Sequence, residues 1–101
     1  MAELYDWLTG QHPGLKTFKA FRQRTLDRAA TDTQHRALYR LLADLASDYI
    51  SRYDAEPVPV DVAERTYSHL LEIVAGAESS LTAQAAEQIQ ALNRLAAAKL
   101  V

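Results

Sequence analysis

Residues 54–67 read DAEPVPVDVAERTY, and this stretch decides how the segments on either side of it are joined. Proline fixes its own φ, lacks an amide hydrogen and pushes the preceding residue towards extended geometry, so Pro57 and Pro59 interrupt any continuous helix here. A lone strand would have nothing to pair with. The stretch is also too short and too apolar for a flexible linker between domains. We therefore predict an extended connection inside one domain, with its valines lying across an end of the core.

On both sides of this connection, apolar residues recur every three or four positions, which is typical of amphipathic helices. The clearest stripe precedes it, and the residues that share its face are Leu38, Leu41, Leu42, Leu45, Tyr49 and Tyr53. The pattern predicts helices over residues 2–9, 15–29, 32–54, 61–77 and 80–100. The expected fold is all-α: a single-domain bundle, residues 1–101, of four main helices plus a short N-terminal helix.

Polar residues at the expected helix starts predict where each helix is capped. Asp32 is a candidate N-cap of the third helix, because its carboxylate can accept a hydrogen bond from a free amide. Asp61 is the expected N-cap of the fourth helix, and Glu64 stands three residues later as in a capping box. Ser79 or Ser80 is the expected cap of the fifth helix.

Composition narrows the functional classes. The chain has 101 residues, 49% of them apolar, a formal charge of −2 and no cysteine. The absence of cysteine excludes disulfides and thiolate metal sites. The start lacks the basic and apolar regions of a signal peptide, and no apolar run approaches the ~18 residues of a membrane span. These features favour a cytoplasmic protein, and eight arginines against three lysines favour a bacterial one.

Two carboxylate–imidazole pairs could in principle hold a metal ion. Asp32 with His35 and His69 with Glu72 are each spaced three apart, so each pair shares a helix face. Di-metal bundles need further inward carboxylates, which the neighbouring helices lack. No nucleophile elbow or phosphate-binding glycine loop is present either. We therefore expect no metal, no cofactor and no enzymatic activity, with a metalloprotein or enzyme as the more distant alternative.

Basic residues gather between positions 16 and 40, which raises an alternative function. A helix, a short turn and a helix beginning TDTQHRALYR resemble a helix-turn-helix in outline, and such a motif binds nucleic acid. The candidate contacts are Lys16, Lys19, Arg28, Thr33, Gln34, Arg36 and Arg40. The overall negative charge makes solvated helix flanks the favoured interpretation of these residues.

Apolar residues beside the main stripes favour a protein that acts by binding another protein. The candidate contacts are Trp7, Tyr39, Ile50, Val62 and Ile73. The alanine-rich fifth helix can also approach another helix closely, and small bundles often form two-fold dimers. We therefore expect a binding, adaptor or regulatory protein that contacts itself or another protein, with the homodimer favoured.

Overall fold

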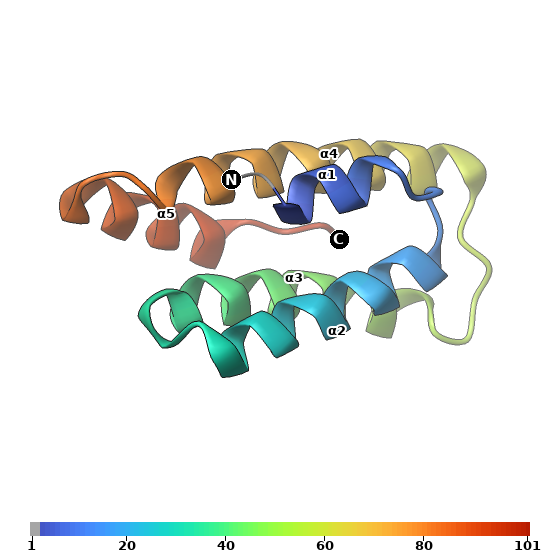
Figure 1. Cartoon of the computed structure of the whole chain (residues 1–101). Coiled ribbons are helices and arrows are strands. Elements are labelled where there is room, and N and C mark those ends of the chain that lie inside the picture. Colours follow the sequence, from blue (N-terminus) through green and yellow to red (C-terminus); the bar gives the residue numbers. More distant parts are fainter. Residues whose placement is uncertain (1–2) are drawn as a thin grey trace.

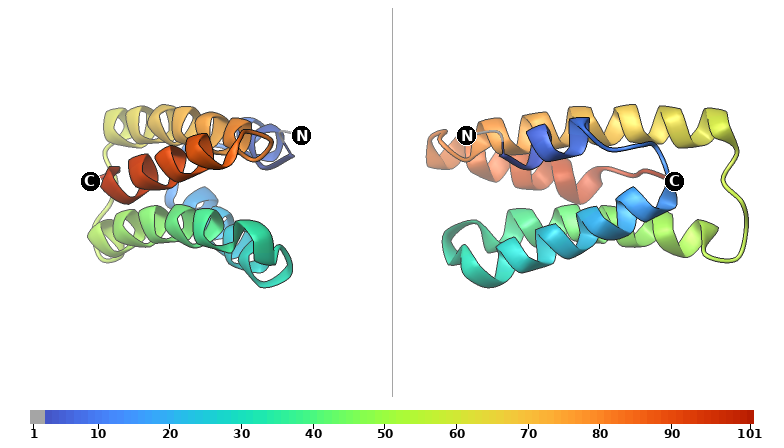
Figure 2. Two further views of the ribbon diagram at one scale, coloured as in Figure 1. Left: turned by 90° about the vertical axis from the view of Figure 1, so that its left-hand side faces the viewer. Right: turned by 45° about the vertical axis from the view of Figure 1, so that its right-hand side comes forward.

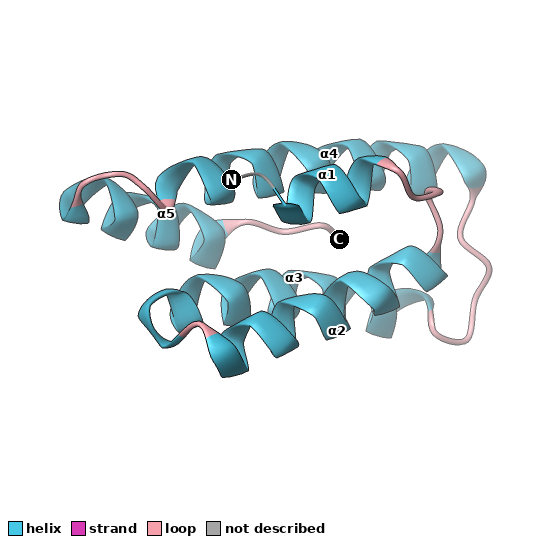
Figure 3. Ribbon diagram, viewed as in Figure 1, coloured by secondary structure: helices cyan, strands magenta, loops and turns pink. Residues whose placement is uncertain are grey.

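The computed structural model describes residues 3–101, and these residues form helices and loops without any β-strand (Figures 1 and 3). The elements are α1 (Glu3–Thr9), α2 (Leu15–Thr31), the short 3₁₀ helix η1 (Thr33–His35), α3 (Arg36–Tyr53), α4 (Val60–Ser80) and α5 (Ala85–Ala97). The predicted all-α bundle is confirmed. The predicted first helix residue, Ala2, lies outside the described residues. No helix within residues 3–101 is both long enough and apolar enough to cross a lipid bilayer.

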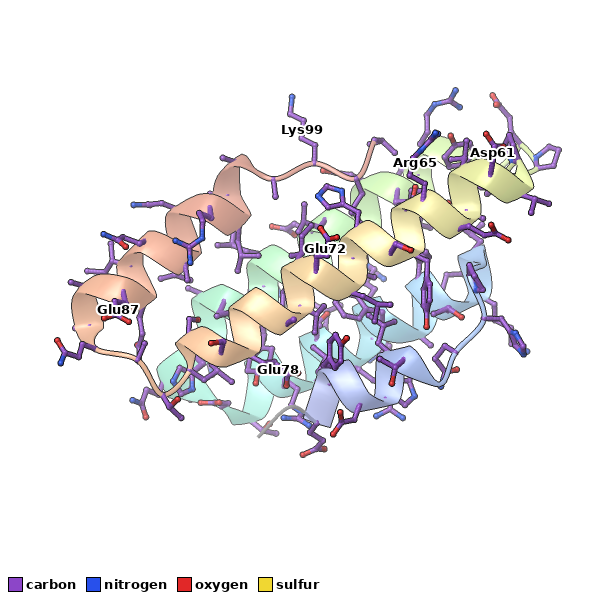
Figure 4. The ribbon with its side chains drawn as sticks, turned by 90° about the horizontal axis from the view of Figure 1, so that it is seen from above. Asp61, Arg65, Glu72, Glu78, Glu87 and Lys99 are labelled. Carbon is purple, nitrogen blue, oxygen red and sulfur yellow. The ribbon has the colours of Figure 1, made fainter. Side chains whose placement is uncertain are left out.

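The helices form two layers. Helices α2 and α3 make an antiparallel hairpin, and α4 lies over that hairpin (Figure 1). Helix α1 lies along one side of α4 and α5 along the other, as the view from above shows (Figure 4). Helix α5 is much shorter than α4, and no other described helix lies against the side of α5 that faces outward (Figure 2). The molecule measures 40 × 23 × 22 Å.

Large apolar and aromatic side chains fill the space between the layers. Phe18 and Phe21 of α2, Tyr49 of α3 and Leu70 of α4 are completely buried. The rings of Phe18 and Tyr49 have centroids 4.3 Å apart in a tilted arrangement, which is a favourable aromatic contact. The stripes predicted for these helices therefore face one shared core, as amphipathic spacing requires.

The turn between α2 and α3 is organised by one carboxylate. Asp32 accepts a hydrogen bond from the backbone N–H of His35 at 3.2 Å, and so caps η1. The predicted capping role of Asp32 is confirmed. The regular α-helix begins only at Arg36, four residues later than predicted, because the first turn is a tighter 3₁₀ turn.

The proline-containing connection is extended, and residues 54–59 lie outside any helix. Val58 is half-buried and packs against the core, as predicted. Val60 is 74% exposed, so its predicted burial is wrong: it is the first residue of α4 and faces solvent. Asp61 does not cap α4, because Pro59 already occupies the N-cap, where its carbonyl accepts the Ala63 N–H at 2.9 Å.

The last two helices differ most from the prediction. Helix α4 continues through Gly76 to Ser80 instead of ending at residue 77. Ser79 and Ser80 therefore belong to α4 and cannot cap α5, and the Ser80 hydroxyl donates to the Ala77 carbonyl at 2.6 Å. A glycine can remain helical when the surrounding packing supports the helix, at a modest loss of stability.

Helix α5 is shorter than predicted and begins at Ala85, not at residue 80. The side-chain amide of Gln88 donates to the carbonyls of Leu81 (3.3 Å) and Ala83 (3.0 Å), and so closes the turn before the helix. At the other end, Ala98 is already extended, with ψ of 151°. Residues 98–101 therefore leave the helix that was predicted to reach residue 100.

Candidate interaction surface

The residues predicted to contact a partner do not form one surface. Tyr39 is only 2% exposed, so its predicted role is wrong: it faces the α2–α3 interface and belongs to the core. Ile50 lines a shallow hollow between α2 and α3. Ile73 lines a groove between α4 and α5. Val62 is half-buried on α4. These side chains are therefore spread over separate parts of the bundle.

Trp7 packs on its own chain. The guanidinium carbon of Arg24 lies 4.3 Å from the centroid of the Trp7 ring, which is a cation–π geometry. The neighbouring residues Leu4 and Leu8 are buried. The tryptophan therefore helps to hold α1 against α2.

Glu78, near the far end of α4, fixes the start of α1, and no local pattern in the sequence indicates this role. Its carboxylate accepts the backbone N–H of Leu4 at 3.1 Å and that of Tyr5 at 2.7 Å. These amides lie in the first turn, where no intrahelical acceptor is available. Glu78 is only 6% exposed, and the Tyr67 hydroxyl donates to the Leu8 carbonyl at 2.6 Å. Both ends of α1 are thus tied to α4.

The outward side of α5 is an apolar feature that the bundle leaves open. Of the thirteen residues in α5, the buried ones are Ala91 and Leu95. The apolar spacing Ala85, Ile89, Leu92 in the sequence predicts that Ile89 faces the core, but Ile89 is 59% exposed, so that prediction is wrong. We define the α5 outer face as the exposed residues Ala85, Ala86, Glu87, Ile89, Gln90, Asn93, Arg94, Ala96 and Ala97. Five of these nine side chains are apolar.

A groove of about 280 Å³ runs between α4 and α5. Ile73 and Ala77 line it from α4, and Ala91 and Leu95 line it from α5. Arg94 lies at its α5 edge. The groove therefore marks the border of the α5 outer face on the side towards α4.

Two of the five basic residues considered for nucleic-acid binding are engaged within the chain. Arg28 pairs with Glu3, and the Arg36 side chain donates to the Ala29 carbonyl at 2.8 Å. The rest of that set, Lys16, Lys19, Thr33, Gln34 and Arg40, is exposed.

The two helices that carry this set are antiparallel neighbours along their length (Figure 1). A helix-turn-helix instead has its helices crossing at about 90–120°. The resemblance seen in the sequence therefore does not extend to the geometry, and nucleic-acid binding stays a prediction.

The Asp32–His35 pair makes a short contact but not a metal site. The Nδ1 atom of His35 lies 2.9 Å from a carboxylate oxygen of Asp32, and this hydrogen bond lowers the pKa of Asp32. The other ring nitrogen, Nε2, is buried and has no hydrogen-bond partner. His69 and Glu72 are both exposed on α4. Over residues 3–101, no three His, Asp or Glu side chains come together where they could hold a metal ion.

Neither a protein family nor a curated protein nor a solved structure matches this chain. Its function must therefore be inferred from its own surface.

Proposed function

We propose that this chain is a small cytoplasmic binding protein, with an adaptor or regulatory role, that acts through protein–protein contacts as a homodimer. The uncovered α5 outer face is the observation that supports this proposal. Single exposed apolar residues are ordinary on protein surfaces. Here the exposed Ile89 and four exposed alanines lie on one helix, so five apolar side chains are exposed on α5.

The limited burial of α5 adds support. A thirteen-residue helix is near the lower limit of stability on its own, so it depends on packing. Yet few of its side chains are buried in the bundle. A second helix laid against the α5 outer face would bury Ile89 and the alanines, each buried CH₂ group adding about 0.8 kcal/mol. Dimer formation would thereby stabilise both copies of α5.

The proposal assigns the chain binding instead of catalysis. It places the protein in the cytoplasm, where a cysteine-free chain needs no oxidising environment to fold. The partner is a second copy, because small helical bundles commonly form closed two-fold dimers with the same surface on both subunits.

Sedimentation or light scattering between about 1 and 200 μM, a range that spans weak and moderate affinities, tests the proposal. We expect the wild-type mass to rise from monomer to dimer across this range. The change Ile89→Glu should keep the protein monomeric, because it places a charge on the contact surface. Val60→Glu is the matched control: Val60 is more exposed than Ile89 but lies at the other end of α4 from α5 (Figure 1). A wild-type protein that stays monomeric throughout contradicts the homodimer.

A further inference from the structure

We infer that α5 pairs with α5 of a second copy in antiparallel orientation, so that Glu87 of each copy faces Arg94 of the other. This geometry rests on the proposed homodimer and specifies its interface. It follows from how apolar and charged residues are placed on the α5 outer face, in the steps below.

The centre of the α5 outer face carries small side chains. Successive helix residues turn by about 100°, so Ala86, Asn93 and Ala97 lie within about 40° of one another. The buried residues Ala91 and Leu95 lie on the opposite side of the helix. Side chains as small as alanine allow two helices to approach to about 8 Å between axes, the short end of the usual range. This face therefore suits another helix better than a bulky ligand.

One edge of the face carries two opposite charges. Glu87 and Arg94 are seven residues apart, which is nearly two turns, so they lie above one another along the same edge. Both are exposed, and neither makes an ion pair with any residue of the described chain. Figure 4 shows Glu87 on α5, near the end of the helix that follows the connection from α4. Each charge is therefore available to a second molecule.

The order of these charges selects the antiparallel orientation. In an antiparallel pair related by a two-fold axis, the two helices run in opposite directions past a shared midpoint. A residue that lies a given number of positions before the midpoint is therefore level with the residue of the second helix that lies the same number of positions after it. The midpoint of Glu87 and Arg94 falls between residues 90 and 91. Pairing about this point sets Glu87 of each copy against Arg94 of the other, twice. A parallel two-fold pair would instead set the charged edge of each copy against the Ile89 edge of the other, which would leave both charges without a partner.

The same midpoint suits the other residues of the face. It brings Ile89 to the level of Leu92 of the second copy, which is itself half-buried, so apolar side chains meet apolar side chains. Gln90, which is exposed, comes close to its counterpart at the axis, and the exposed Asn93 lies about two residues in level from Gln90 of the second copy. Their amides each have donors and an acceptor and can hydrogen-bond with one another.

The size of this interface sets the expected affinity. Thirteen residues make a helix about 20 Å long. A single pair of such helices buries less than the ~800 Å² per partner of a standard interface. We therefore expect a weak dimer, with a dissociation constant in the micromolar range.

Charge exchange tests the orientation. Glu87→Arg and Arg94→Glu should each weaken the dimer about 10- to 30-fold, because each turns two attractive pairs into two repulsive ones. The double variant should regain wild-type affinity. An equimolar mixture of the two single variants should form heterodimers more tightly than either variant forms homodimers. Glu64→Arg, at an exposed position of α4, changes the net charge as Glu87→Arg does and should dimerise like the wild type.

Sedimentation equilibrium with one variant fluorescently labelled gives all of these constants, and circular dichroism verifies that each variant is folded. A wild-type dimer that is disrupted by Ile89→Glu but unaffected by either charge reversal overturns the antiparallel pairing and leaves the proposed function standing. Mixed variants that associate no better than each alone also overturn it. A wild-type protein that is monomeric at every concentration overturns both the pairing and the proposed function.

Discussion

Replacing Glu78 by glutamine should loosen α1 from the rest of the bundle. The carboxylate accepts hydrogen bonds from two backbone amides, those of Leu4 and Tyr5. Glutamine keeps the length of the side chain but removes its charge. It can also offer only one oxygen, and its NH₂ group would face an amide N–H. At least one of the two amides therefore loses its acceptor in a site that is 6% exposed.

The expected loss can be worked from these two hydrogen bonds. A hydrogen bond to a charged group contributes about 1.5 kcal/mol at the lower end of its range, so the pair contributes about 3 kcal/mol. Retaining one weaker, neutral hydrogen bond returns about 1 kcal/mol, which leaves a loss of about 2 kcal/mol. Whole domains are stable by only about 5–15 kcal/mol, so this loss is measurable. With a urea slope near 1.5 kcal/mol per molar, the unfolding midpoint should fall by about 1.3 M.

The fluorescence of Trp7 allows the unfolding of α1 to be followed separately from the unfolding of the whole protein. It is the only tryptophan in the chain and lies in α1, so its fluorescence reports whether α1 is docked. Circular dichroism at 222 nm reports all of the helices. In Glu78→Gln we expect the fluorescence change to begin at lower urea than the loss of helicity, whereas the two should coincide in the wild type.

Glu72→Gln is the matched control, since it makes the same change at an exposed position of the same helix. It should leave the midpoint within about 0.3 M of wild type, as surface substitutions usually do. The reasoning is refuted if Glu78→Gln shifts the midpoint no more than this control and the two signals still coincide. In that case the Glu78 carboxylate would not stabilise α1.

Two further substitutions test local features of the helices. Gly76→Ala should stabilise the protein by about 0.5–1 kcal/mol, because Gly76 is helical and a Cβ there would meet no atom within 4 Å. The midpoint of thermal unfolding should rise by a few degrees in this variant, whereas Ala75→Gly at the neighbouring position should lower the midpoint. In the folded protein, the contact with His35 holds the pKa of Asp32 below its ordinary value of 3.8. The contact therefore stabilises the fold above that pH, and this stabilisation is lost as the pH falls through the pKa that Asp32 has in the folded protein. The stability difference between wild type and Asp32→Asn, from urea melts, should therefore be full near pH 6 and disappear in strong acid; a difference that persists unchanged in strong acid contradicts this.

The sequence was most informative where large apolar residues recur. The stripes of α2 and α3 contain leucines and aromatic residues, whose burial dominates the free energy of folding, so their inward faces were predicted correctly. Tyr39 was misplaced because it lies at the edge of its stripe. In a hairpin of two long helices that edge faces the neighbouring helix, and the sequence does not show which helix is the neighbour.

Helix α5 shows why alanine-rich segments are harder to orient. Alanine occurs both in cores and on surfaces, so it does little to fix the rotation of a helix. Ile89 was the largest apolar residue in the middle of the segment and suggested the wrong side. The smaller Ala91 lies inside instead, next to the groove that α5 shares with α4. Whether Ile89 or Ala91 faces inward depends on how closely α4 and α5 approach, and the sequence does not show that distance.

Glu78 could not have been identified from its neighbours in the chain. Its partner Leu4 is 74 positions away, and a lone glutamate in a helix is normally solvated. Local patterns describe which residues share a face, but they do not describe which distant backbone amide a side chain reaches. The interaction depends on the final packing of α1 on α4.

That separation also orders the steps by which the chain acquires its structure. Residues 3–9 are synthesised well before Glu78 and Tyr67, whose side chains form hydrogen bonds with the backbone of α1. The hairpin of α2 and α3, whose contacts are closer in sequence, can assemble during this interval at a lower entropic penalty for loop closure. We therefore expect α1 to reach its final position only after α4 has formed.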